Sequence, residues 1–284
     1  MAPKRSGVAH LYLSDLDFTL LRSDQTVGAL TQKVWNDCVA QGLRLSIATA
    51  RSHTGVSKLL RGLTLREPMI LLDGVMIALA DGEILYLSAI DKALGDEILA
   101  AVYDVSGVYP LLVGLDGADK ERFAYPKEKT PCQQRLIQTF HNDRRLLDHE
   151  PFGAFRRNLK IVYVDTKERT AEWEALLKER FGSLIEIKRN PDPYIDCWFM
   201  TVLHKEGDKA HALARLEAMA GVSRADTTVF GDSHNDLGLF RMAGRKIAVA
   251  NAIEELKAVA DLVLPWSNDE EGVARFLQQE VCDA

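Results

Sequence analysis

The stretch "HLYLSDLDFTLL", residues 10–21, determines how the rest of the chain is interpreted. The segment 8–14 is short, apolar and rich in residues that favour strands, so we expect it to form a buried β-strand. Two carboxylates, Asp15 and Asp17, follow the strand with one residue between them. Because unpaired carboxylates are costly to bury, two acids at the end of a buried strand need an explanation.

The composition is that of a globular protein, with 284 residues, 47% hydrophobic residues and a formal net charge of −6. This length allows one large domain or two ordinary ones. The negative charge argues against nucleic acid as a partner, whereas a small phosphorylated molecule needs only a local positive site. No apolar run is long and uncharged enough to span a bilayer, and Asp15 and Asp17 interrupt the apolar segment that a signal peptide requires.

These features predict a cytoplasmic protein, a monomer or small homo-oligomer, with no nucleic-acid or membrane partner. The cysteines agree with this location because they are far apart and form neither a C-x-x-C pair nor a zinc-binding spacing. They are Cys38, Cys132, Cys197 and Cys282. We therefore expect reduced thiols, as in most cytosolic proteins.

The two ends of the chain have the same predicted order of secondary-structure elements. Strands and helices alternate up to about residue 79 and again from about residue 204, which is typical of parallel βαβ units. Between them, turn signals such as Asp81-Gly82 and Asp116-Gly117 indicate hairpins mixed with helices. The sequence therefore predicts an α/β fold with a Rossmann-like parallel sheet built from 1–79 and 204–284. The segment 80–203 is expected to be an inserted α+β unit.

Four polar clusters lie at comparable places in this predicted core. Each follows a predicted strand or begins a helix, and their members are Asp15 and Asp17; Thr49 and Arg51; Lys209; and Asp232, Asn235 and Asp236. Because ligands bind outside the carboxyl ends of the strands in open parallel sheets, we expect the clusters to meet in one site.

The mixture of groups in these clusters favours one kind of chemistry. Several carboxylates in one pocket repel each other unless a cation joins them, and oxygen ligands suit a hard cation such as Mg²⁺. Thr49 and Lys209 donate hydrogen bonds and positive charge, which suits a phosphate. Acids with a metal beside phosphate donors predict phosphoryl transfer.

Taken together, "DLDFTLL" (15–21), "ATARS" (48–52), "DKAHAL" (208–213) and "GDSHND" (231–236) resemble the four motifs of the haloacid dehalogenase (HAD) superfamily. The segment 248–277 resembles the Cof-type branch, whose phosphatases carry a large C2-type α/β cap after the second motif. The resemblance implies that 80–203 is this cap, which would supply leaving-group specificity and exclude water. Two positions depart from the family pattern, because Phe18 and Ala50 replace the usual glycines. Phe18 is expected to alter the loop and narrow the pocket, whereas Ala50 is small enough for phosphate to approach.

The resemblance also implies a role for each motif residue. Asp15 is the nucleophile that forms an aspartyl-phosphate, and Asp17 is the general acid and base. The implied Mg²⁺ ligands are Asp15, the backbone carbonyl of Asp17, and Asp232, with Asp236 in support. The phosphoryl group is implied to be held by Thr49, Lys209, Asn235 and the backbone at Leu16 and Ala50. Arg51 is expected either to reach substrate or to brace the cap.

Simpler interpretations compete with this one, since each acid could cap a helix and Lys209 could be an exposed lysine. All four motifs in order make a site the better hypothesis. The first functional hypothesis is a Mg²⁺-dependent phosphomonoester hydrolase that acts on a small phosphorylated metabolite, with sugar phosphates as the leading class. The alternatives are a phosphomutase with the same nucleophile and a non-catalytic phosphate-binding module. A dehalogenase is disfavoured because Asp17 and the acidic cluster have no purpose in that reaction.

Overall fold

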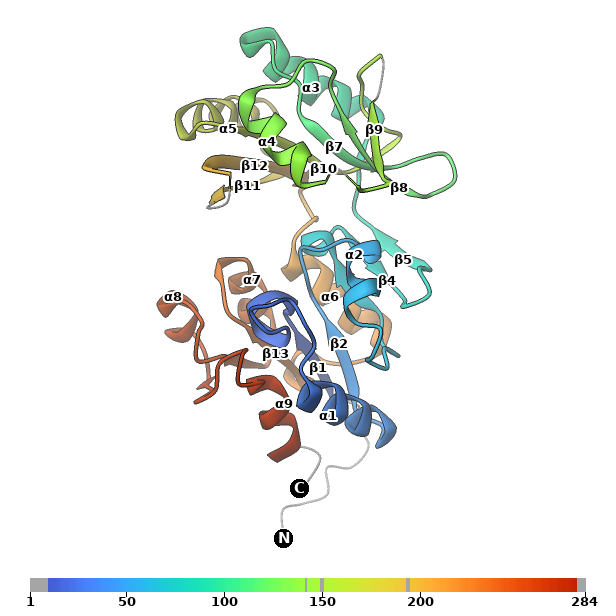
Figure 1. The fold of residues 1–284 in the computed structure, drawn as a ribbon, viewed down its shortest axis with the longest axis vertical. Helices are drawn as coiled ribbons and strands as arrows, with labels where there is room; N and C mark the ends of the chain where they lie inside the picture. The colour runs from blue at the N-terminus through green and yellow to red at the C-terminus, as the bar shows by residue number, and fades with distance from the viewer. Residues whose placement is uncertain (1–9, 141, 149–150, 193–194, 280–284) are drawn as a thin grey trace. The chain divides into compact units, whose positions relative to one another are not determined.

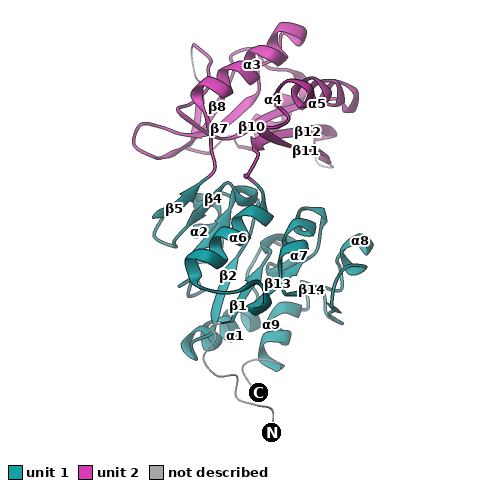
Figure 2. Cartoon of the chain, turned by 180° about the vertical axis from the view of Figure 1, so that it is seen from behind, with its two compact units in different colours: residues 1–87, 208–284 teal, residues 88–207 magenta. Residues whose placement is uncertain are grey.

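The computed structural model describes the chain except for residues 1–9, 141, 149–150, 193–194 and 280–284 (Figure 1). It divides into two compact units (Figure 2). Unit 1 combines Met1–Leu87 with Asp208–Ala284, and unit 2 is Ser88–Gly207. In the described part of the chain, every helix is too short or too polar to cross a membrane.

The centre of unit 1 is a five-stranded sheet in which all neighbours pair in parallel, in the order β15-β14-β13-β1-β2. Its strands are β1 (Leu11–Ser14), β2 (Arg44–Ile47), β13 (Thr227–Gly231), β14 (Arg245–Ala248) and β15 (Leu262–Val263). β1 lies between β2 and β13, and Leu11 and Leu13 are fully buried, as expected for a strand covered on both faces. Ser14 is in register with Ile47 and Phe230, so the three strands end at the same edge of the sheet.

The other elements of unit 1 surround this sheet. The helices are α1 (Ala29–Ala40), α2 (His53–Leu59), α6 (Lys209–Ala220), α7 (Leu237–Met242), α8 (Glu254–Lys257) and α9 (Gly272–Leu277). A small antiparallel sheet consists of β3 (Met69–Leu71), β4 (Met76–Ala78) and β5 (Ile84–Leu87). α1 packs against α9, and α6 packs against α7. α6 begins where the Asp208 carboxylate accepts from the His211 backbone N–H (2.9 Å), and it ends at Gly221, whose φ is +63°.

Unit 2 is a mixed sheet with helices on both faces. The strands are β6 (Ile90–Asp91), β7 (Leu111–Leu115), β8 (Glu121–Tyr125), β9 (Leu146–Asp148), β10 (Arg157–Asp165), β11 (Ile185–Asp192) and β12 (Cys197–His204). α3 (Lys92–Ser106) and α5 (Lys167–Phe181) pack on the larger apolar core, and α4 (Pro131–Thr139) packs on a smaller one. Alternate side chains of β10 enter the two cores, with Ile161 and Tyr163 in the larger and Val162 and Val164 in the smaller.

This architecture confirms the predicted fold class, a parallel-sheet α/β core with an inserted α+β unit. The compact units divide after Leu87 and Gly207, and the sequence placed the breaks after 79 and 203. β8 and β9 were not predicted. β8 reads "ERFAY", and its charged first two residues hide the alternation that identifies a half-buried strand.

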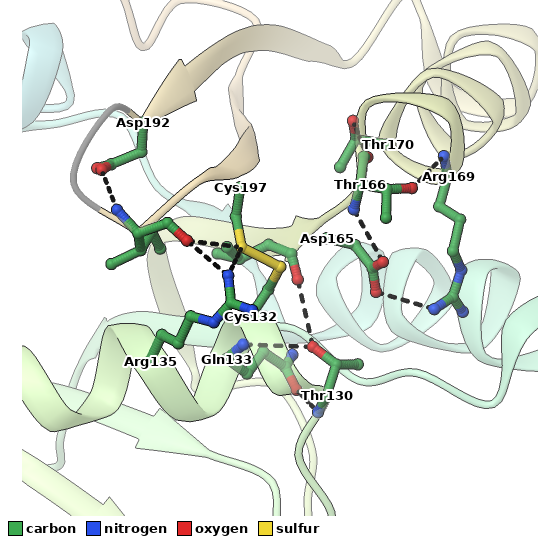
Figure 3. Close-up of a disulfide and its surroundings, with 12 residues drawn as sticks. Thr130, Cys132, Gln133, Arg135, Asp165, Thr166, Arg169, Thr170, Asp192 and Cys197 are labelled. Carbon is green, nitrogen blue, oxygen red and sulfur yellow. Dashed lines mark hydrogen bonds and ion pairs between the residues drawn. A yellow bond between two sulfur atoms is a disulfide. The ribbon is translucent and has the colours of Figure 1, made fainter.

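The prediction of reduced thiols is wrong for the described cysteines, none of which is free. Cys132, in the first turn of α4, forms a disulfide with Cys197 at the start of β12, with their Cα atoms 6.1 Å apart (Figure 3). The two are 65 residues apart in sequence, and their spacing says nothing of this tertiary proximity. Arg135, one turn further along α4, donates to the Ile195 carbonyl (2.9 Å) beside the disulfide. Cys282 lies outside the described residues.

We predict that replacing both Cys132 and Cys197 with serine lowers the free energy of unfolding by about 2–4 kcal/mol, because the cross-link restricts the unfolded chain. Urea denaturation of oxidised wild type and the double variant would measure the difference. Wild type treated with a dithiol reductant should be no more stable than the double variant, because the reductant opens this bridge and also the disulfide of Cys38. Equal urea midpoints for the oxidised and reduced proteins would contradict the prediction.

Candidate active site

Four segments of unit 1 bring the predicted residues together at the carboxyl edge of the parallel sheet. Asp15 follows β1, Thr49 follows β2, Lys209 begins α6, and Asp232 and Asp236 follow β13. The Asp15 backbone N–H donates to the Phe230 carbonyl (2.9 Å), which extends the strand pairing by one residue. All five side chains are buried, so this is not a set of solvated surface charges.

The buried ammonium of Lys209 joins two of the acids. Its Nζ donates to Asp15 Oδ1 (2.5 Å) and to Asp236 Oδ1 (2.7 Å). A neighbouring loop lies directly against the start of α6, which carries Lys209. At Gly74, which has φ +110°, a Cβ atom would lie only 2.1 Å from the Asp208 carbonyl oxygen, so glycine is required there.

Hydrogen bonds hold the loop after β13 in place. Asp236 Oδ2 accepts from the backbone N–H groups of Asp232 (3.1 Å) and Ser233 (3.2 Å), while its other oxygen faces Lys209. Asn235 Oδ1 accepts from the Ser233 hydroxyl (2.7 Å). Asp236 therefore fixes the conformation of the loop that carries Asp232.

Thr19 is a member of the cluster to which the sequence assigned no role. Its hydroxyl donates to Asp232 Oδ1 (2.7 Å), and both side chains are buried. The signal was present in the sequence, since Thr19 stands two residues after Asp17 in the same stretch. Its partner, 213 residues away, could not be identified from that stretch alone.

The electrostatics of the cluster are dominated by burial. Burial raises the pKa of Asp15 well above its usual value, and the carboxylates of Asp236 and Asp232 raise it further, whereas Lys209 lowers it. Burial likewise raises the pKa of Asp232 to about 6, against the lowering effect of the Thr19 hydrogen bond. For Lys209, burial opposes the charge, but the carboxylates of Asp15 and Asp236 outweigh it and raise the pKa. Three carboxylates thus face one ammonium, and ionisation of all three leaves negative charge uncompensated.

This donor set fits a hard divalent cation. Asp15, Asp232 and Asp236 each offer a carboxylate oxygen, and these oxygens lie within 4.8 Å of one another. Oxygen-only sites favour Mg²⁺ or Ca²⁺ over softer metals, and a cation would offset the repulsion among these carboxylates. Asp17, also predicted as a ligand through its backbone carbonyl, lies next to the cluster in sequence, but its carboxylate pairs with Arg51 instead.

The remaining predicted residues lie on the segments that flank the cluster. Leu16 is buried at the start of the helical turn Leu16–Leu20, and Ala50 is exposed directly after Thr49. The Thr49 hydroxyl accepts from the Arg51 backbone N–H (3.1 Å). Phe18, in place of the usual glycine, has φ +57°, a conformation that favours glycine, and its side chain is 48% exposed.

The family model of the haloacid dehalogenase-like hydrolases matches residues 12–277, and the chain therefore belongs to this family. The chain is 28% identical to the 5-amino-6-(5-phospho-D-ribitylamino)uracil phosphatase YwtE of Bacillus subtilis, over 93% of this chain and 96% of that protein. It is 26% identical to the HMP-PP phosphatase of Cronobacter sakazakii, over 88% of each chain. The fold resembles the crystal structure of a haloacid dehalogenase-like hydrolase from Bacteroides thetaiotaomicron, with a TM-score of 0.78 and 24% identity. That match covers 95% of this chain and 98% of the other. These matches confirm the family predicted from the four motifs.

We predict that Asp232→Asn gains stability relative to wild type as the pH rises from about 4 to about 7 in the presence of EDTA. The folded state raises the pKa of Asp232 to about 6 from its ordinary value of 3.8. As the pH rises between these values, the unfolded state loses the proton before the folded state does, so wild type becomes less stable, whereas asparagine cannot ionise. The relative gain should approach about 3 kcal/mol, because each tenfold change in proton affinity between the folded and unfolded states corresponds to about 1.36 kcal/mol.

Urea denaturation of both proteins across this pH range measures the effect. Excess Mg²⁺ near neutral pH should reverse the order of stability, since only wild type keeps all three carboxylates. A stability difference that is independent of pH would contradict the prediction.

Proposed function

We propose that this hydrolase is a Mg²⁺-dependent phosphatase that cleaves a phosphomonoester through an aspartyl-phosphate on Asp15. The observation that carries the proposal is the buried Asp15 carboxylate, held by Lys209 within an oxygen cluster that fits a divalent cation. The names of two relatives support it, because the matched proteins of Bacillus subtilis and Cronobacter sakazakii are both named as phosphatases.

The first half of the proposed reaction uses the two acids of the opening stretch. An Asp15 carboxylate oxygen attacks phosphorus, and the phosphorus–oxygen bond to the leaving group breaks as the new bond forms. Asp17 gives a proton to the departing oxygen, which leaves as an alcohol. A positioned acid of this kind contributes roughly 10²–10⁴-fold in rate.

The second half regenerates the enzyme. The Asp17 carboxylate takes a proton from water, whose oxygen attacks phosphorus and releases inorganic phosphate and the Asp15 carboxylate. Lys209 orients the nucleophilic carboxylate through its 2.5 Å hydrogen bond and keeps positive charge beside it throughout. Thr49, Asn235 and the backbone at Leu16 and Ala50 are proposed to hold the phosphoryl oxygens.

Mg²⁺ bound by Asp15, Asp232 and the Asp17 carbonyl, with Asp236 in support, would supply the charge neutralisation that lets one anion approach another. The proposed substrate is a small phosphorylated metabolite, with sugar phosphates as the leading class. The YwtE relative, named for a phosphorylated ribityl compound, supports a phosphorylated polyhydroxy substrate.

We predict that Asp15→Asn lowers phosphate release from an aryl phosphate by at least about 10³-fold, because an amide oxygen is a far weaker nucleophile than a carboxylate. Wild type should also lose activity in EDTA and recover it with Mg²⁺. Circular dichroism before each assay checks that the variant is folded. A folded wild type as inactive as the variant in Mg²⁺ would favour a non-catalytic phosphate-binding module instead.

A further inference from the structure

The carboxylate of Asp17 is held by a two-point ion pair with Arg51. Arg51 Nε lies 2.8 Å from Asp17 Oδ2, and Arg51 Nη2 lies 2.6 Å from Asp17 Oδ1. Among the residues that the structure describes, Arg51 is the only side chain that hydrogen-bonds this carboxylate. Two parallel N–H···O bonds fix the plane of a carboxylate as well as its position, which a single contact does not.

Arg51 is itself held at both ends. Its backbone N–H donates to the Thr49 hydroxyl (3.1 Å), and its carbonyl accepts from the Leu72 N–H (3.0 Å). At the far end, Nη2 also donates to Gln25 Oε1 (3.1 Å), and Gln25 lies in a left-handed turn with φ +63°. The guanidinium is therefore a braced support for Asp17 rather than a freely moving surface group.

Stability does not account for this bracing. The side chains of Arg51 and Asp17 are 28% and 34% exposed, and ion pairs open to solvent contribute little to the folded state. Orientation is the better explanation, because a proton donor must lie within hydrogen-bonding distance of the group that it protonates. Asp17 also needs external support, since it lies in a kinked turn and precedes Phe18 in the left-handed region.

We propose that Arg51 is a positioning residue that holds the Asp17 carboxyl group in the orientation from which it protonates the leaving oxygen. This inference rests on the proposed function. It differs from the expectation that Arg51 binds substrate, because Nε and Nη2 already contact Asp17 and Gln25. Proton transfer to the ester oxygen, as its bond to phosphorus breaks, is the step that depends on Arg51. In the protonated acid one oxygen of Asp17 carries the proton toward the leaving oxygen, and the other oxygen keeps its hydrogen bond to Arg51.

The chemistry of the leaving group distinguishes a positioning role of Arg51 from phosphate binding or a structural role. An alkoxide is a poor leaving group and needs the proton, whereas a dinitrophenolate leaves readily without one. The parameter kcat/KM reports the steps up to departure of the leaving group and is independent of the later hydrolysis of the aspartyl-phosphate. Loss of positioning should therefore lower kcat/KM for an alkyl phosphate and spare kcat/KM for dinitrophenyl phosphate.

The test compares wild type, Arg51→Ala and Arg51→Lys with a hexose phosphate and dinitrophenyl phosphate, in excess Mg²⁺. We expect Arg51→Ala to lower kcat/KM about 10–100-fold for the hexose phosphate and less than about 3-fold for the dinitrophenyl ester. Arg51→Lys keeps the charge but not the two-point geometry, so its loss should be intermediate and confined to the hexose phosphate.

Arg44→Ala is the matched control, because Arg44 forms a similar partly buried pair with Glu67 (2.6 Å) away from Asp17. It should leave the ratio of the two kcat/KM values unchanged. Equal losses for both esters in Arg51→Ala would overturn the inference in favour of phosphate binding or a structural role, and no loss for either would also overturn it. Wild type inert toward both esters would instead refute the proposed function, and the inference with it.

Discussion

The buried ammonium of Lys209 lies between the carboxylates of Asp15 and Asp236, and the rest of the site depends on this ion triad. A lysine without these partners would be costly to bury, and the carboxylates would be costly to bury without it. The triad joins the end of β1, the start of α6 and the loop after β13. It therefore fixes three distant segments relative to one another while leaving the cluster short of positive charge.

The parallel sheet makes this convergence possible. Because β1, β2 and β13 end in register, the residues that follow them leave the sheet at the same edge. Asp236 holds the loop backbone beneath Asp232, and Thr19 orients the Asp232 carboxylate. The proposed nucleophile, cation ligands and proton donor thus rest on short turns at the ends of rigid strands, which suits a site that must be formed before substrate arrives.

The sequence was sufficient to predict the fold class and to place Asp15, Lys209, Asp232 and Asp236 in one cluster, because both depend on local signals, but it did not identify Thr19 as a member. Strand ends, helix caps and short motifs place Asp15, Lys209 and Asp232 without knowledge of any distant contact. Side-chain pairing depends on the tertiary structure instead. Three contacts join segments whose spacing in the sequence does not predict that they meet. They are the Thr19–Asp232 hydrogen bond, the Arg51–Asp17 ion pair and the Cys132–Cys197 disulfide. From the sequence alone, Arg51 was expected either to contact substrate or to brace the cap. The structure shows that Arg51 hydrogen-bonds both carboxylate oxygens of Asp17.

Crystallography can test directly whether this lysine-bridged cluster accepts one divalent cation beside Asp15. Crystals soaked with Mn²⁺, a hard cation with anomalous scattering, would locate the metal independently of any assay. We predict one strong anomalous peak within coordination distance of carboxylate oxygens of both Asp15 and Asp232. No peak at these residues in crystals that bind Mn²⁺ elsewhere would contradict it.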